Sequence, residues 1–220
     1  MLRLAGVAGL ALITAACTTP GRVRDEWERV RGYNEDGVQL FQRGDYVHAR
    51  ECFQAALALR PHDADMIYNL GRCYDLLGQS PQAEQTYRQC LQLAPQHAEC
   101  RHSLAVLLVH DNRKDEAARL VEDWLQQEPR RAAAYAEQAY LYREAGDLVA
   151  AQQRLQQALA LDPHDPSALS ELAQVYEIQN RPDRALELYQ RALDSNPRRI
   201  DLAQRVSFLK SQGTGRPLPD

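Results

Sequence analysis

A strict 34-residue period constrains the fold of this chain more than any other feature. Five prolines follow one another at this spacing without an insertion: Pro61, Pro95, Pro129, Pro163 and Pro197. Alanines keep the same step at positions 49, 83, 117, 151 and 185, and small residues keep it at positions 37, 71, 105, 139 and 173. A period of this length indicates a repeat architecture, in which each unit packs only against its neighbours.

A fourth series in the same phase predicts how each unit turns. Positions 44, 78, 112, 146 and 180 hold only glycine or asparagine. These residues adopt positive φ most readily, as a helix requires when it ends in a left-handed turn. Each unit is therefore predicted to be a helix, a tight turn, a second helix and a proline-marked turn.

Composition agrees with a helical, globular chain. The 220 residues are 45% hydrophobic and 25% charged, an ordinary folding composition that excludes disorder throughout and a collagen-like structure. Only 7% are aromatic, and strong helix formers dominate, so we expect an all-α fold. The net charge of -4 provides no basic field, and we expect no nucleic-acid partner.

The periodic residues resemble the tetratricopeptide repeat pattern over five units from Val30 to Arg199. The second unit carries the signature most fully, with Ile67, Leu70, Gly71 and Tyr74 in its first helix and Ala83, Tyr87 and Leu91 in its second. The resemblance implies an all-α, right-handed superhelical solenoid of five helix-turn-helix units, 30–63, 64–97, 98–131, 132–165 and 166–199. Apolar residues in 200–212 predict a helix that caps the array. Residues 213–220 are expected to form a disordered tail.

Some residues depart from the repeat pattern. Trp124 occupies a position where the other units have Ala56, Cys90, Ala158 and Ala192. We predict that Trp124 is buried against the small residues Ala132, Ala133, Ala134 and Ala136. Asp36 and Gln138 replace a leucine and Arg101 replaces a large apolar residue, so the sequence specifies the packing of units one, three and four less firmly.

The first residues resemble a bacterial lipoprotein signal. An apolar run ends at Ala15 and Ala16, directly before Cys17, although Thr14 stands where such signals usually have leucine. The resemblance implies that residues 1–16 are removed and that Cys17 carries diacylglycerol and an N-acyl chain. Residues 17–29 would then form a tether and lead-in. Thr18, rather than aspartate, favours the outer membrane and a protein facing the periplasm. Ordinary signal cleavage, an uncleaved anchor and a misassigned start remain alternatives.

Four cysteines follow Cys17, and their state is open. An antiparallel packing across the turn would bring Cys90 and Cys100 together as a disulfide, and Cys52 and Cys73 are similarly related. Alternatively, these cysteines are small buried residues in place of alanine.

Motif inspection gives no sign of an enzyme or a metal site. No phosphate-binding loop, HExxH helix, GxSxG elbow or dinucleotide fingerprint is present, so we expect no catalytic residue, no small-molecule substrate and no cofactor besides the lipid. The cluster of Cys90, His97, Cys100 and His102 matches no zinc module by spacing, and we expect no bound metal.

The repeat template predicts a peptide-binding groove on the concave side. Its expected lining is Asn34, Val38, Phe41, Tyr68, Asn69, Arg72, Asp75, His102, Val106, Val109, His110, Glu137, Tyr140 and Arg143. Such a mixture suits an extended peptide or a partner helix. Within the family, a clamp for a terminal carboxylate needs cations where this chain has Glu99 and Ser103; only Asn69 matches. We therefore do not expect a carboxylate-clamp co-chaperone.

Together these features predict a non-enzymatic scaffold for protein–protein interaction, anchored to a membrane. By resemblance, lipoproteins of this layout include pilotins of type IV pilus secretins and Flp pilus assembly lipoproteins, which implies an adaptor in assembling an envelope complex. Two alternatives stay open: an adaptor for peptidoglycan enzymes, and a soluble, unlipidated, chaperone-like module.

Overall fold

The computed structural model describes residues 20–195 and 200–212, which contain eleven helices and no strand. The helices are α1 (Pro20–Gln42), α2 (Tyr46–Leu59), α3 (Ala64–Leu76), α4 (Ser80–Leu93), α5 (Ala98–His110), α6 (Lys114–Gln127), α7 (Ala132–Glu144), α8 (Leu148–Leu161), α9 (Pro166–Ile178), α10 (Pro182–Ser195) and α11 (Ile200–Ser211). The expectations for the signal 1–16, for Cys17, for the end of the fifth unit at 196–199 and for the tail 213–220 lie outside these residues.

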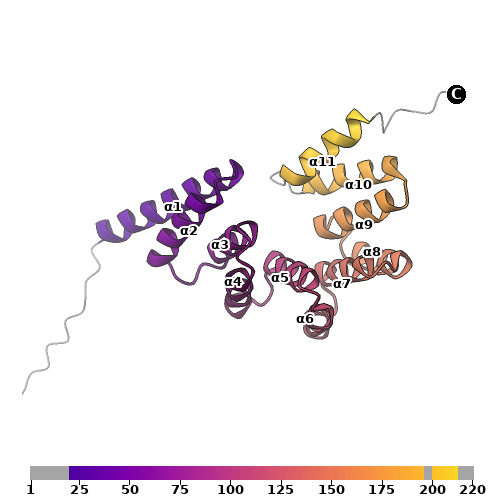
Figure 1. Ribbon diagram of the computed structural model, residues 1–220, viewed down its shortest axis with the longest axis horizontal. Helices are drawn as coiled ribbons and strands as arrows, with labels where there is room; N and C mark the ends of the chain where they lie inside the picture. Colours follow the sequence, from indigo (N-terminus) through magenta and orange to yellow (C-terminus); the bar gives the residue numbers. More distant parts are fainter. Residues whose placement is uncertain (1–19, 196–199, 213–220) are drawn as a thin grey trace, which may run out of the picture.

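Odd-numbered helices from α1 to α9 begin the five units, and the following even-numbered helices complete them. Each helix packs against the next, and the array curves as a right-handed superhelical solenoid, visible as the open arc of Figure 1. The last helix, α11, packs on α10 and buries Leu202, Val206 and Leu209. It thus covers the apolar face of the fifth unit, as a capping helix must.

The tight turns within the units follow the predicted chemistry. Gly44, Gly78 and Gly146 have φ of 81°, 70° and 82°, and the asparagines at 112 and 180 have φ of 61° and 57°. The prediction of left-handed residues at this fourth series is confirmed.

Glycines also permit the two helices of a unit to approach closely. A Cβ added to Gly71 would lie 2.6 Å from the Tyr87 ring, and one added to Gly37 would lie 2.8 Å from the Phe53 ring. In the third unit the same two positions hold Ala105 and a smaller side chain, Val121, both buried. The residue types at the two positions are matched in size in these three units, whereas the fifth unit has Ala173 with Tyr189, both buried.

Trp124 is only 1% exposed, which confirms the prediction that it is buried. Its ring lies 4.7 Å from the guanidinium of Arg101, itself buried. Arg101 donates hydrogen bonds to the carbonyl oxygens of Pro95 and Leu120, so its charge is solvated by the backbone. Arginine and tryptophan together thus fill a space that the second and fifth units fill with Ile67 and Cys90 and with Leu169 and Ala192.

The part of the expected tether and lead-in that the structure describes is helical. Helix α1 begins at Pro20, so residues 20–29 extend the first helix. Proline suits a first helical position, and Trp27 is held 5.7 Å from the guanidinium of Arg60. At 1.5 Å per residue this extension spans about 15 Å. No helix in the parts of the chain that the structure describes has the length and apolar character to cross a membrane.

Candidate functional site

The N-terminal half of the concave surface carries an arginine held between aromatic rings. The guanidinium of Arg72 lies 4.3 Å from the ring centre of Phe41 and 5.7 Å from that of Tyr68. Tyr68 in turn contacts the rings of Tyr87 and His97, at 6.3 Å and 5.4 Å between centroids. Within the described residues no carboxylate lies within ion-pair distance of Arg72. Its N–H groups are thus oriented and available to an incoming ligand.

Other predicted residues of this half surround that cluster. Val38 packs against a buried group that contains Phe53, and Asn69 is half-buried. The Asn34 side-chain oxygen is buried with no hydrogen-bond partner among the described residues. Burial raises the pKa of Asp75, although His110 and Arg72 act in the opposite direction.

In the C-terminal half, the predicted residues pair with one another. His102 Nδ1 lies 2.9 Å from Glu137 Oε2, and the His102 ring lies 5.2 Å from that of Tyr140. Arg143 Nε donates a 3.0 Å hydrogen bond to Glu171 Oε2, and its guanidinium lies 5.3 Å from the Tyr140 ring. The structure brings these residues close together, and their polar groups pair with one another.

The exposure of two predicted residues needs correcting. Glu137 and Tyr140 are each only 6% exposed, so they form the floor of the concave surface and offer little contact area. In unit three, Val106 is half-buried and Val109 packs against the core around α4, α5 and α6. The His110 side chain remains 84% exposed, with Nδ1 3.5 Å from an oxygen of Asp111.

Sequence reasoning missed the continuation of this polar network into the fifth unit and the cap. Glu177 accepts a 2.8 Å hydrogen bond from the Tyr189 hydroxyl and forms an ion pair with Arg205 of α11. The two ion pairs, Arg143–Glu171 and Glu177–Arg205, each join residues 28 positions apart. In the first pair the arginine comes earlier in the sequence, and in the second pair the glutamate does. That repeated spacing is a sequence signal that could have found them.

Burial dominates the electrostatics of this network. The pKa of Glu171 is raised by burial, despite the opposing charges of Arg143 and His102. Burial acts to lower the pKa of Arg143, but its interaction with Glu171 raises it overall. The pKa of Tyr140 is raised by burial as well, so its hydroxyl stays neutral.

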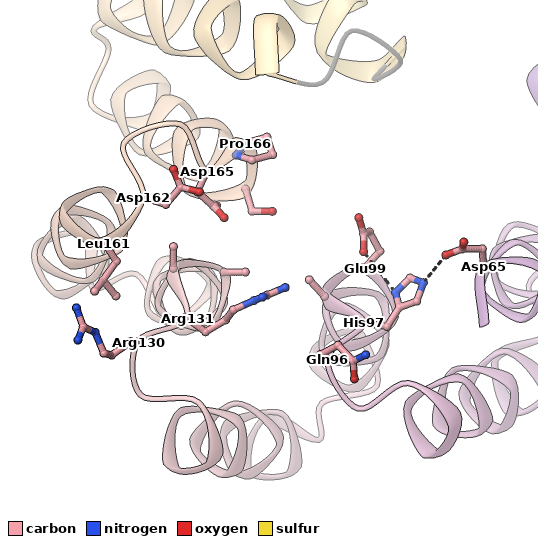
Figure 2. Close-up of a pocket in the computed structure, with 14 residues that line it drawn as sticks. Asp65, Gln96, His97, Glu99, Arg130, Arg131, Leu161, Asp162, Asp165 and Pro166 are labelled. Carbon is pink, nitrogen blue, oxygen red and sulfur yellow. Dashed lines mark hydrogen bonds and ion pairs between the residues drawn. The ribbon is translucent and has the colours of Figure 1, made fainter. Parts of the chain in front are cut away.

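A hollow of about 540 Å³ lies beside this surface, where the first turns of α3, α5, α7 and α9 converge (Figure 2). His97, Glu99 and Asp65 line one wall, and Arg131 and Asp165 lie toward the other. The groove prediction did not include it, although residues 65, 99, 133 and 167 share the 34-residue step.

The structure joins Cys90 and Cys100 as a disulfide with a Cα–Cα distance of 6.4 Å. Cys52 and Cys73 are free thiols, so the second pairing considered from the sequence is not formed. Cys73 is fully buried, and burial raises its pKa to about 11.

Comparison with known proteins identifies the family. The sequence matches the model of the Tetratricopeptide repeat family over residues 40–89, 81–139 and 142–206. The chain belongs to the tetratricopeptide repeat family. Members of this family mediate protein–protein interaction, and the scaffold is generally non-catalytic.

Solved structures of the tetratricopeptide repeat class share the fold. A thermophilic TPR protein of Thermus thermophilus superposes with a TM-score of 0.60 at 27% identity, covering 83% of this chain and 99% of that one. PilF of Pseudomonas aeruginosa superposes with a TM-score of 0.54 at 19% identity, covering 86% and 91%.

Curated relatives are similar only over a small part of their length. The human Protein O-mannosyl-transferase TMTC1 is 31% identical over 159 residues, 70% of this chain but 18% of TMTC1. The Peroxisomal targeting signal receptor of Eremothecium gossypii is 36% identical over 70 residues, 32% of this chain and 12% of the receptor. The chain therefore spans less than a fifth of the length of these relatives.

Proposed function

We propose that this protein is a non-enzymatic adaptor that binds a partner protein on its concave surface while anchored to a membrane of the bacterial envelope. The observation that carries the proposal is Arg72, which is held between Phe41 and Tyr68 and has no carboxylate of the described residues within ion-pair distance. The other half of the surface is already satisfied within the chain. Partner contacts should therefore concentrate in the first two units.

The chemistry of the Arg72 cluster supports protein binding. Arginine and tyrosine are enriched among interface residues whose truncation is most costly, because they combine apolar area with directed hydrogen bonds. Ring contacts fix the guanidinium before a ligand arrives, which reduces the entropy lost on binding. Asn69, half-buried on the same helix, adds a side-chain amide for a peptide backbone.

Anchoring would come from Cys17. Diacylglycerol with a further acyl chain supplies about 0.8 kcal/mol per buried methylene, which is sufficient for durable attachment. Helix α1 begins three residues after that cysteine. The first two units would then be the part of the solenoid closest to the membrane.

An envelope complex such as a type IV pilus or its secretin is the assembly that we favour. The basis is the lipoprotein layout with five repeats; the likeness to PilF, at 19% identity, supports the common fold alone. Two functions compete with this one: an adaptor for peptidoglycan enzymes, and a soluble, chaperone-like module. All three share the binding surface and differ in anchoring and partner.

The binding surface is tested by replacing Tyr68 and Arg72 together by alanine in the full-length protein. Partner recovery after in vivo crosslinking and affinity purification should fall about tenfold or more, since interface hot spots contribute at least 2 kcal/mol. Val149→Ala, at a side chain that is 70% exposed on α8, is the matched control. Equal recovery by the folded double variant and the control would reject the concave-surface assignment.

Anchoring is tested separately by Cys17→Ala. We expect the protein to move from the membrane to the soluble fraction, and the mass of the native protein to equal residues 17–220 plus the acyl groups. An unchanged membrane pool would reject Cys17 as the anchor, and an unlipidated mass of a protein found in the soluble fraction would favour the soluble, chaperone-like alternative.

A further inference from the structure

Three side chains with metal-binding atoms come together where α4 is followed by α5. Cys90 lies in the last turn of α4, Cys100 lies in the first turn of α5, and His97 precedes α5 directly. One donor atom from each residue lies within 4.8 Å of the other two. The fold thus assembles a cluster whose sequence spacing matched no known zinc module.

The other junctions show that the repeat does not need these residue types. Equivalent positions hold Ala56, Trp124 and Ala158 in place of Cys90, then Asp63, Arg131 and Asp165 in place of His97, and Met66, Ala134 and Ala168 in place of Cys100. Aspartate caps the helix at two of those junctions. Sulfur and imidazole are therefore combined at one junction only among those described, and helix packing alone does not explain the combination.

His97 is oriented as a metal-ligating histidine usually is. Its Nε2 lies 3.2 Å from Asp65 Oδ1, and its Nδ1 accepts the backbone N–H of Cys100 at 3.2 Å. A carboxylate on one ring nitrogen fixes the ring and its tautomer, so the other nitrogen, which caps α5 here, would exchange the Cys100 N–H for an ion. The His97 side chain is only 10% exposed, so this orientation is held by its surroundings.

Glu99 lies on the open side of the cluster, outside the group of three donors, and its exposed side chain would turn inward to reach an ion. Its Oε2 lies 3.3 Å from His97 Nδ1, and its side chain is 65% exposed to the hollow in Figure 2. The hollow gives an ion a route to both atoms.

We propose that Cys90 and Cys100, when reduced, bind Zn²⁺ together with His97 and Glu99, and that the disulfide is the metal-free form. Two thiolates, one imidazole and one carboxylate match the ligands and the tetrahedral geometry of zinc. With Zn–S bonds of about 2.3 Å, the sulfur atoms would lie about 3.8 Å apart. The two forms would differ in the two cysteine side chains, in the cap bond of His97 and in the position of the Glu99 side chain.

Interconversion of the two forms balances through thiol–disulfide exchange. A dithiol reductant gives two electrons and two protons to the Cys90–Cys100 disulfide and is itself oxidised to a disulfide. The two thiols then release two protons as Zn²⁺ binds their thiolates. A disulfide oxidant reverses the reaction and releases the ion. Zn²⁺ therefore binds before the cysteines are oxidised, or under reducing conditions.

Zinc titration of the full-length protein tests the proposal. The reduced protein, freed of reductant without oxygen, should bind one Zn²⁺ per chain by native mass spectrometry, and the oxidised protein none. Cd²⁺ should give the thiolate charge-transfer absorption on the reduced protein only. Absence of tight Zn²⁺ binding to the reduced protein would overturn the proposal.

Matched variants distinguish this site from the other thiols. Cys90→Ala introduces the residue that three other units have, and should weaken Zn²⁺ binding at least 100-fold while the helical signal is kept. His97→Asn retains a good helix cap and should weaken binding about tenfold or more. Cys52→Ser with Cys73→Ala should still bind one ion. If Cys90→Ala bound Zn²⁺ as well as the wild type, or if the Cys52/Cys73 variant lost it, the assignment would be wrong.

Discussion

Replacing Gly71 by alanine should destabilise the protein, although alanine is normally the better helix former. The added Cβ would lie 2.6 Å from Cε1 and 2.8 Å from Cδ1 of Tyr87, whose side chain is fully buried. Overpacking of this kind typically costs about 1–3 kcal/mol. The gain in helix propensity of up to about 1 kcal/mol offsets part of it. We expect a net loss of about 1–2 kcal/mol, since the ring has no solvent to move into.

Gly32 provides the matched control for this substitution. It lies inside α1, and an added Cβ would meet no atom within 4 Å. Gly32→Ala should therefore stabilise the protein by about 0.5–1 kcal/mol through helix propensity alone. Thermal unfolding followed by circular dichroism should show opposite shifts, with Tm lowered by about 2–8 °C for Gly71→Ala and raised by a few degrees for Gly32→Ala.

A second substitution identifies the ring as the cause. Gly71→Ala with Tyr87→Val reproduces the buried pair Ala105 and Val121 of the third unit. The double variant should lose less stability than the sum of the two single variants, by about 1 kcal/mol or more. Additive losses, or equal Tm shifts for Gly71→Ala and Gly32→Ala, would refute the close-approach argument.

Three further predictions concern buried polar groups and the disulfide. Arg101→Ala should cost about 3 kcal/mol in urea unfolding, because it removes a large buried side chain from a tryptophan ring and leaves two carbonyl oxygens without their donor; a loss below 1 kcal/mol would contradict this. Burial raises the pKa of Glu171 in the folded protein above the ordinary value that it has in the unfolded chain. The Glu171 carboxyl therefore contributes its full stability at a pH below that ordinary value, and this contribution is lost as the pH rises through the folded-state pKa. Glu171→Gln should remove this part of the pH dependence, and identical pH profiles would argue against a perturbed carboxyl. Reduction of the Cys90–Cys100 disulfide, which closes a separation of 10 residues, should lower stability by about 2–3 kcal/mol in metal-free buffer; unchanged unfolding would mean that the loop is already constrained.

The sequence predicted the features that every unit must repeat. The left-handed turn at Asn112 could be predicted because its position falls in a series with glycine, and the burial of Trp124 because the position is buried in every unit. Both depend only on the place of a residue within the 34-residue period. The core of a repeat protein is set by such nearest-neighbour contacts, and periodicity therefore records it.

Features that depend on two units at once were harder to predict. The pairing of Arg143 with Glu171 joins different positions of successive units, and appears only when the repeats are superposed. The proximity of His97 to Cys90 and Cys100 depends on how closely α4 and α5 pack across a turn. The helical extension of α1 before Val30 lies outside the period altogether, so no repeat predicts it.

The two halves of the concave surface differ in what they leave for a partner. In α7, α9 and α11, arginines and carboxylates are paired across successive units, and a ligand would have to displace an internal ion pair to contact them. Removing one member of a buried pair is unfavourable, because the remaining charge stays desolvated. In α3, by contrast, Arg72 has rings as its neighbours and can donate to a carboxylate or a backbone carbonyl of a partner without breaking an ion pair among the described residues. Binding energy should therefore come mainly from the N-terminal units, while the paired C-terminal units maintain the curvature that presents them.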